Sequence, residues 1–318
     1  MDYKGKRVLL IAGGGTLGTY VGKELLRLGA KVEVICPEDK ISDHPNLSFY
    51  KTLATTEFLT DLFSKNHYDG IVNFLHYTTV EAYKAAHPLI MSATDHLIFL
   101  SSYRIYADEQ SPITESAPRL LDVVKDEEFL LKENYALPKA RCEDYLNSEC
   151  KGQRWTAVRP VISLSHRRFD LLMYSGHELI KRAESGEELL MPESARNLGA
   201  GLDWAGNSGK LIANLLFKPE TFGEAYTVSS GKSRTWGECA DIYSAVLGLK
   251  VRWVSEEEYV DANPSLRGGD KWRWIYDRKF DRRVDNSKIL KATGLRGDDF
   301  TPLADGIKIE LELLKNNG

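Results

Sequence analysis

Hydrophobic positions in the first 160 residues alternate between short unbroken runs and longer stretches with helical spacing. A short apolar run is typical of a buried strand, whereas apolar residues three and four apart indicate one face of a helix. We expect strands at residues 7–12, 32–36, 47–50, 70–75, 96–100 and 155–159. We expect helices at residues 17–28, 58–63 and 129–146, and a further helix from 80 to 86. Strands that alternate with helical crossovers predict an α/β fold with a doubly wound parallel sheet.

The alternation weakens after Pro160, where residues 165–197 and 264–283 carry more Arg, Trp, Gly and Ser. Between these segments we expect helices at 207–217 and 236–247 and strands at 225–228 and 251–254. We therefore predict a nucleotide-binding domain at residues 1–164 and a smaller C-terminal substrate-binding region at 165–318, interleaved with the last strands of the sheet. The alternating Trp272, Trp274 and Tyr276 fit one face of a strand or a stacking wall, with core packing as an equal alternative.

Composition narrows the class of protein. The chain has 318 residues, 42% hydrophobic residues and a net charge of −4, which argues against attraction to nucleic acid or an anionic membrane by the overall field. Its four cysteines have no zinc-ligand spacing, and no apolar stretch is long enough to span a bilayer. We expect a reduced cytoplasmic protein without a structural metal or membrane segment.

A glycine-rich turn follows the first expected strand. Gly13, Gly15 and Gly18 form GxGxxG, with Thr16 and Leu17 inside it, at the start of the first expected helix. This context suits a dinucleotide pyrophosphate, because glycines allow close backbone approach and the helix N-terminus presents free N–H groups.

The end of the second strand bears on the choice of cofactor. Glu38 follows that strand, and an acid there binds the ribose 2′-hydroxyl of NAD. We expect NAD, with NADP as the alternative.

Reactive side chains follow later strands of the expected sheet. Tyr135 and Lys139 are four residues apart on one expected helix, where a lysine ammonium lowers the pKa of a phenol and makes it a usable acid or base. Ser102 follows the strand at 96–100, where a hydroxyl can hydrogen-bond a substrate oxygen.

Together these residues resemble the extended short-chain dehydrogenase/reductase superfamily, also called the NAD-dependent epimerase/dehydratase family. The resemblance spans nearly the whole chain and rests on residues 10–18, 99–106, 112–115, 134–139, 158–160, 223–228 and 285–288. It implies a Rossmann-type fold in which Ser102 holds the substrate oxygen and Tyr135 transfers the proton. It further implies that Lys139 binds the nicotinamide ribose and lowers the Tyr135 pKa, and that the protein dimerises through the Tyr135 helix.

The chain also departs from the family pattern. Ala12 stands where the family's first turn glycine falls, and Tyr103 with Arg104 replaces the Asp-Glu pair of the 4,6-dehydratases, which argues against dehydration. Further candidate substrate residues are His76, Tyr103, Arg273 and Arg278, with His76 favoured as a hydrogen-bonded residue at the rim.

These features predict an NAD-dependent epimerase or oxidoreductase that acts at a hydroxyl or ketone of a sugar, with a nucleotide sugar as the favoured small-molecule partner. Two alternatives stay open. One is an NADP-dependent ketoreductase of a small carbonyl compound. The other is a non-catalytic, RNA-associated relative, for which residues 167–168 and 278–283 offer a local basic patch.

Overall fold

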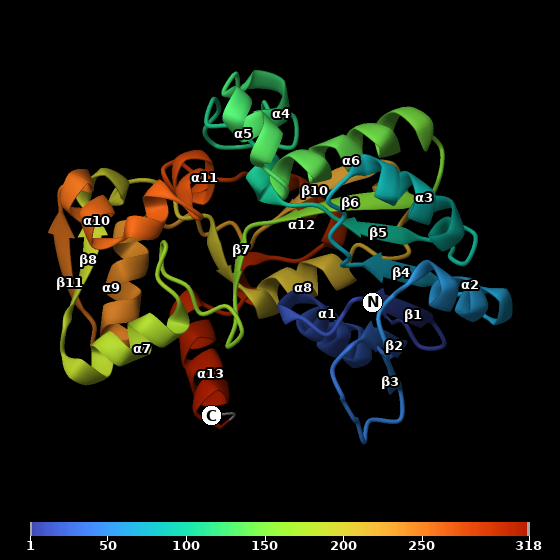
Figure 1. Ribbon diagram of the computed structural model, residues 1–318. Helices are drawn as coiled ribbons and strands as arrows, with labels where there is room; N and C mark the ends of the chain where they lie inside the picture. Colours follow the sequence, from blue (N-terminus) through green and yellow to red (C-terminus); the bar gives the residue numbers. More distant parts are fainter. Residues whose placement is uncertain (1, 317–318) are drawn as a thin grey trace.

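The computed structural model of the protein describes residues 2–316 and is organised around one parallel sheet (Figure 1). The sheet has seven strands in the order β10-β6-β5-β4-β1-β2-β3. Their bounds are β1 Arg7–Ile11, β2 Lys31–Cys36, β3 Leu47–Lys51, β4 Gly70–Asn73, β5 Leu97–Leu100, β6 Trp155–Pro160 and β10 Glu224–Val228. Every pair is parallel, so the predicted doubly wound α/β fold is confirmed.

The strand order reverses next to β1. The chain moves outward from β1 through β2 to β3, then returns to pair β4 on the other side of β1 and continues through β5 and β6. In open α/β sheets, ligands bind in the crevice that such a reversal leaves at the carboxyl ends of the strands. The topology thus locates the candidate site beyond the ends of β1, β4, β5 and β6.

Helices cover both faces of the sheet. On one face α1, Thr16–Arg27, packs against α8, Ala205–Ala213, and α12, Ser287–Thr293, lies beside β10 (Figure 1). The opposite face is covered by α2 Thr56–Lys65, α3 Val80–Met91 and α6 Ala136–Glu149. The two resulting apolar cores bury both faces of the central strands, which explains why those strands are continuous hydrophobic runs.

One expected helix is divided in two. The sequence predicts a helix over 129–146, but the structure has α5, Glu127–Lys132, and α6, Ala136–Glu149, separated by a short break. Pro138 lies in the first turn of α6, where its missing N–H costs no helical hydrogen bond. The buried Glu133 accepts hydrogen bonds from the backbone N–H groups of Tyr135 and Leu137, at 3.0 and 2.9 Å, and so caps α6. The break places Tyr135 at the N-cap of α6 rather than inside a long helix.

The remaining elements form a C-terminal lobe beside the sheet, at the left of Figure 1. It contains two small parallel sheets, one of β7 Ile162–Leu164 and β9 Leu202–Trp204, the other of β8 Glu188–Pro192 and β11 Lys250–Val254. Its helices are α7 Gly176–Ser185, α9 Trp236–Leu247, α10 Glu256–Ala262, α11 Lys271–Arg273 and α13 Leu303–Asn316. The short α4, Leu120–Val123, and α5 pack with residues of the 272–280 segment. Strand β10 and helices α8 and α12 return to the main sheet, while the division at residue 164 stays a prediction.

The aromatic residues at 272–276 are helical, so the strand, one of the alternatives for them, is wrong. Trp272 and Tyr276 pack against Phe129, and Trp274 packs against Tyr259. Helical spacing sends the alternating side chains in different directions, and these contacts belong to the packed interior between α5, α10 and α11. No helix among residues 2–316 is long and apolar enough to cross a membrane.

Candidate active site

The glycine turn connects β1 to α1 and is shaped by close backbone contacts. A Cβ on Gly18 would lie 2.2 Å from the carbonyl oxygen of Gly13, so glycine is required where α1 packs on the turn. A Cβ on Gly13 would lie 2.6 Å from Cβ of Leu10, whereas one on Gly15 would meet nothing within 4 Å. Gly15 is the N-cap of α1 and has no side-chain cap, so the first N–H groups of the helix face open space. Backbone donors at an open helix N-terminus suit a phosphate group.

Ala12 begins this turn with φ of 54°, in the left-handed region that disfavours a side chain with a Cβ. We therefore expect Ala12→Gly to raise the free energy of unfolding by about 1 kcal/mol, measured by urea denaturation. The matched control is Ala82→Gly on the exposed face of α3, which should lower stability by about 0.5–1 kcal/mol. A loss of stability in Ala12→Gly comparable to that control would contradict the strain at this position.

A cavity of about 510 Å³ lies beyond the carboxyl ends of the strands, directly beside the glycine turn. It is lined by residues from both halves of the chain: Ala12, Gly15, Thr16, Leu17, Gly18, Phe74, Leu100, Ser101, Ser102, Tyr103, Arg104, Tyr135, Pro160, Val161, Ser163, Arg168, Asp170 and Arg273. The cavity therefore brings the candidate cofactor turn, the serine segment and Tyr135 to one place.

Tyr135 lines this cavity, and Lys139 lies beside it, outside the cavity lining. The Lys139 ammonium is buried, donates a hydrogen bond to the carbonyl oxygen of Leu100 at 2.5 Å, and lies 5.3 Å from the centre of the Tyr135 ring. Burial lowers the pKa of Lys139, although Tyr135 and Glu143 oppose that change. The carbonyl contact fixes the lysine on the side of α6 that faces the end of β5.

The pKa of the Tyr135 phenol lies below its ordinary value of 10. Burial alone would raise this pKa, but the charge of Lys139, a hydrogen bond with Ser102, and the charges of Arg104 and Arg168 outweigh burial. The Arg104 guanidinium lies 4.8 Å from the centre of the Tyr135 ring. A phenol with its pKa lowered in this way can accept a proton from a substrate hydroxyl more readily than an ordinary tyrosine.

The two serines after β5 have different surroundings. The hydroxyl of Ser102 accepts a hydrogen bond from the backbone N–H of Arg104 at 3.2 Å, and its influence lowers the pKa of the Tyr135 phenol. The hydroxyl of Ser101 lines the cavity, is buried, and has no hydrogen-bond partner within the described residues 2–316. Buried hydroxyls are almost always hydrogen-bonded, so Ser101 is suited to contact a bound molecule.

The other candidate residues are distributed around the cavity. The ring of His76 lies 5.3 Å from the ring of Tyr135, and its Nε2 is 2.9 Å from the carbonyl oxygen of Asn134. His76 is exposed and lies outside the cavity lining, a placement that agrees with a residue at the rim. Burial of part of the ring and the charge of Lys139 lower the pKa of His76, so its neutral form is favoured.

The three remaining substrate candidates form one charged wall. Tyr103 and Arg273 line the cavity. The buried Arg278 lies behind them, where it donates hydrogen bonds to the hydroxyl of Tyr103 at 3.1 Å and to the carbonyl oxygen of Leu172 at 2.9 Å. Tyr103 in turn donates to the carboxylate of Asp277 at 2.7 Å. Arg278 is thus placed to support the wall, while Tyr103 and Arg273 can touch a ligand.

Glu38 follows β2, at the position where a residue of this fold would contact the adenosine ribose of a dinucleotide. A Cβ on Gly14 would come within 2.6 Å of its carboxylate, which shows how closely Glu38 approaches the turn. Two cations lie at the same position. Lys40 and Arg167 donate hydrogen bonds to the carbonyl oxygen of Gly14 at 2.7 and 2.9 Å, and Arg167 also pairs with Glu38 at 3.3 Å.

A tight turn at residues 165–168 crosses from the C-terminal lobe to the glycine turn. The hydroxyls of Ser165 and Thr16 are hydrogen-bonded at 2.9 Å, which adds to the contact of Arg167 with Gly14. On its other side, the turn is held by the buried carboxylate of Glu310, which accepts from the backbone N–H of His166 at 2.7 Å. Helix α13 therefore supports the wall of the cavity through this turn.

The arrangement fits a dinucleotide better than a metal ion. The open space over Gly15, the free N–H groups of α1 and the unpartnered hydroxyl of Ser101 all border the same cavity. Within residues 2–316 there is no group of three or more His, Cys, Asp or Glu side chains that is arranged to hold a metal ion. The fold is a Rossmann-type α/β architecture with a cavity at the carboxyl ends of its strands.

Comparison with known proteins agrees with this architecture. No family model and no curated protein sequence matches the chain. Solved structures do match. UDP-N-acetylglucosamine 4-epimerase from Bacillus cereus aligns with a TM-score of 0.69 and 16% identity over 98% of this chain and 96% of that one.

Two further structures match along nearly their whole length. UDP-glucose 4-epimerase from Thermotoga maritima, solved with UDP-glucose, has a TM-score of 0.68 and 16% identity over 98% of this chain and 99% of its own. The enzyme WbmG from Bordetella bronchiseptica, solved with NAD, has a TM-score of 0.68 and 15% identity over 98% of this chain and 94% of its own. At these identities the likeness establishes the fold, and the Rossmann-type fold implied by the sequence resemblance is confirmed.

Several cavity residues were not selected from the sequence as site residues. Ser101 directly precedes the selected Ser102, and Arg104 stands out in the sequence only as a departure from the dehydratase pattern. Arg168 and Asp170 come from the segment after β7, which has no regular hydrophobic pattern to place it. The signal available for them was the concentration of arginine in residues 165–197 and 264–283.

Proposed function

We propose that the protein is an NAD-dependent epimerase or oxidoreductase that acts on a hydroxyl or ketone of a sugar, with a nucleotide sugar as substrate. The observation that carries the proposal is the placement of Tyr135 and Ser102 around one cavity with the glycine turn, with the Lys139 ammonium 5.3 Å from the centre of the Tyr135 ring. The cofactor and substrates printed for the structural neighbours, NAD for WbmG and UDP-sugars for the two 4-epimerases, support this choice.

The chemistry assigned to each side chain follows from its contacts. When bound, the nicotinamide accepts a hydride from the substrate carbon or returns one to it. Tyr135 takes the proton from the substrate hydroxyl, because its lowered pKa makes the phenolate accessible. Lys139 stabilises that phenolate and would hold the ribose of a bound nicotinamide, while Ser102 orients the phenol and Ser101 offers a hydrogen bond to the substrate oxygen.

A second function is favoured by the cations at the adenosine end. Lys40 and Arg167 lie beside Glu38 and provide two donors for a ribose 2′-phosphate. That observation supports the NADP-dependent ketoreductase of a small carbonyl compound as the second candidate. The RNA-associated alternative receives no such support, because Arg278 and Arg282 of the 278–283 segment are buried and present no charge at the surface.

The proposal is tested by denaturing the purified protein and identifying the released small molecules by mass. We expect NAD, because an epimerase re-uses the same nicotinamide in every cycle and gains nothing from releasing it. The protein freed of its bound molecules is then titrated with NAD and with NADP, and its intrinsic tryptophan fluorescence gives the affinity for each cofactor. Failure of both to bind would overturn the proposal, and binding of NADP alone would favour the ketoreductase.

A further inference from the structure

Positive charge is in excess at the wall of the cavity that faces Tyr135. The charged residues lining the cavity are Arg104, Arg168, Arg273 and the single acid Asp170. Asp170 is shared, since its carboxylate lies 3.4 Å from Nε of Arg168 and 3.3 Å from a guanidinium nitrogen of Arg273. Arg273 also lies 4.0 Å from Asp270, at the limit of an ion pair. Arg168 has only the shared carboxylate of Asp170, and one carboxylate between two guanidiniums leaves it incompletely neutralised.

Acids behind the wall do not remove this excess. Arg104 lies 3.5 Å from Asp277 and 3.8 Å from Glu133, and both distances are longer than a hydrogen bond. Asp277 is moreover already paired with the buried Arg278 and lies 3.5 Å from the buried Arg282. The Nε atom of Arg104 is buried without a hydrogen-bond partner in the described part of the chain.

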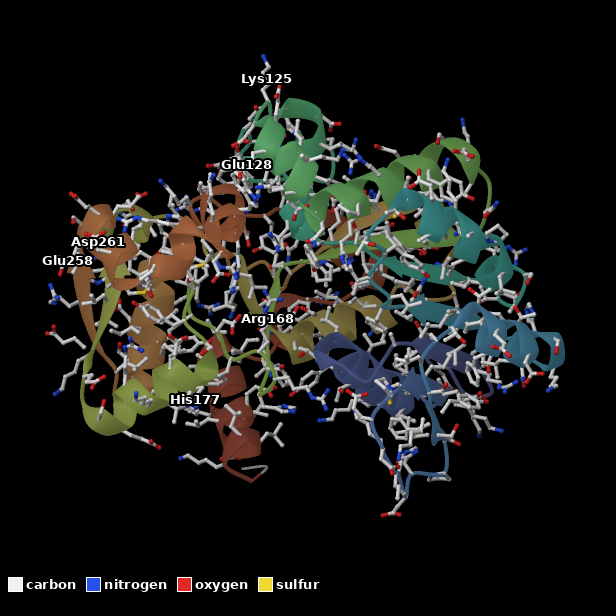
Figure 2. The ribbon with its side chains drawn as sticks, viewed as in Figure 1. Lys125, Glu128, Arg168, His177, Glu258 and Asp261 are labelled. Atoms are coloured by element: carbon white, nitrogen blue, oxygen red, sulfur yellow. The ribbon has the colours of Figure 1, made fainter. Side chains whose placement is uncertain are left out.

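Two of these arginines lie close to the reacting group. The Arg104 guanidinium is stacked 4.8 Å from the Tyr135 ring centre, and the charges of Arg104 and Arg168 both act on the Tyr135 phenol. Figure 2 shows Arg168 between the sheet and the C-terminal lobe, and Arg168 lines the cavity. An anion that neutralised these two groups would therefore sit beside the reacting carbon, not at a remote end of the ligand.

Resting on the proposed function, we infer that the substrate carries an oxyanion, a carboxylate or phosphoryl group, within a few bonds of the reacting hydroxyl, and that Arg104 and Arg168 bind it. Arginine presents a planar set of donors that matches either group. A sugar acid or a sugar phosphate satisfies this requirement, whereas a sugar with only hydroxyls leaves the excess charge in place. Burial lowers the pKa of Arg273, and like-charge repulsion from Arg278 and Arg168 lowers it further, which agrees with an excess of positive charge at this wall.

The test compares ligands that differ only in the acidic group. Binding of UDP-glucuronate and UDP-glucose to the NAD-loaded protein is measured by calorimetry, and glucuronate, glucose 6-phosphate and glucose are compared in the same way. We expect the acidic member of the UDP pair to bind about 10- to 100-fold more tightly, the range for hydrogen bonds to charged groups. The free sugars then show whether carboxylate or phosphoryl is the better ligand.

Matched variants assign the effect to the two arginines. Arg104→Gln and Arg168→Gln should each reduce the preference to within about threefold, and Arg168→Lys should retain part of it, since a charge remains. The control is Arg154→Gln, because Arg154 is exposed and precedes β6 at the opposite end of the strands. Thermal unfolding of all four variants separates loss of the anion contact from loss of folding.

The outcomes separate this inference from the proposed function. Equal affinity for UDP-glucuronate and UDP-glucose, or a preference that persists in both glutamine variants, would overturn the anion site even if NAD-dependent turnover is present. Absence of binding by all five compounds would also count against it. Absence of NAD binding would instead overturn the proposed function, and would do so whatever the ligand preference.

Discussion

Tyr135→Phe is expected to lower kcat about 10²- to 10⁴-fold while leaving the Kd for NAD unchanged, because the variant loses only the hydroxyl that exchanges the proton. The ring keeps its contacts with Arg104 and His76, so the wall of the cavity is preserved. Turnover of the substrate identified by the binding experiments is measured by chromatographic separation of substrate and product, which reports epimerisation and net oxidation alike. Tyr145→Phe on the same helix is the control, since Tyr145 lies outside the cavity lining. Wild-type turnover by Tyr135→Phe would rule out the proposed role of this phenol.

The same phenol determines the direction of the pH dependence. Oxidation of a hydroxyl needs the phenolate, which exists above the pKa, so the oxidation rate should rise as pH increases through the lowered pKa of Tyr135. Lys139→Met removes the largest favourable influence on the phenolate, and the rise should move to higher pH. Lys84→Met, at an exposed position on α3, should leave the profile in place. An identical profile in wild type and Lys139→Met would contradict the role assigned to the lysine.

Glu143→Ala is expected to lower the free energy of unfolding by about 3–5 kcal/mol, because it leaves the buried Arg159 without its counter-ion. Arg159 projects from β6, pairs with Glu143 on α6, and donates to the hydroxyl of Tyr106 at 2.8 Å. This pair connects the helix that carries Lys139 to the strand beneath it. Urea denaturation followed by circular dichroism measures the loss.

Two variants on the same structural elements test that explanation. Glu149→Ala should scarcely change stability, because Glu149 pairs with Lys84 in solvent. The double substitution Glu143→Leu with Arg159→Met should recover most of the loss, since replacing a buried ion pair by apolar groups removes its desolvation cost. A Glu143→Ala protein as stable as Glu149→Ala would show that the buried pair contributes little.

Sequence pattern predicted the sheet well and the site only in part. The strands are continuous apolar runs because both faces are covered, and each expected strand of the first half is present near its expected bounds. The sequence predicts one helix over 129–146, where the structure has two, because apolar residues keep helical spacing across the break between α5 and α6. Pro138 was the readable signal, since proline is tolerated in the first turn of a helix and not in its interior.

The glycine turn, Tyr135, Lys139 and Ser102 could be selected because each follows or begins a regular element. Arg104, Arg168 and Asp170 could not, because their proximity is created by the return of the C-terminal lobe over the strand ends. No local rule relates residues so far apart in the chain. The excess of positive charge at the cavity therefore arises only when the chain folds, and the overall net charge of −4 does not indicate it.

The position of β10 has a consequence for how the chain is made. Strand β10 completes the sheet by pairing with β6, although the whole stretch from 161 to 223 separates them in the chain. During synthesis β6 therefore leaves the ribosome with an unpaired edge that stays open until residue 228 has emerged. Open strand edges promote association between chains, and pairings distant in sequence form slowly. Nascent chains halted between residues 165 and 220 should consequently be prone to aggregation and dependent on chaperones, whereas chains that extend past β10 close this edge themselves.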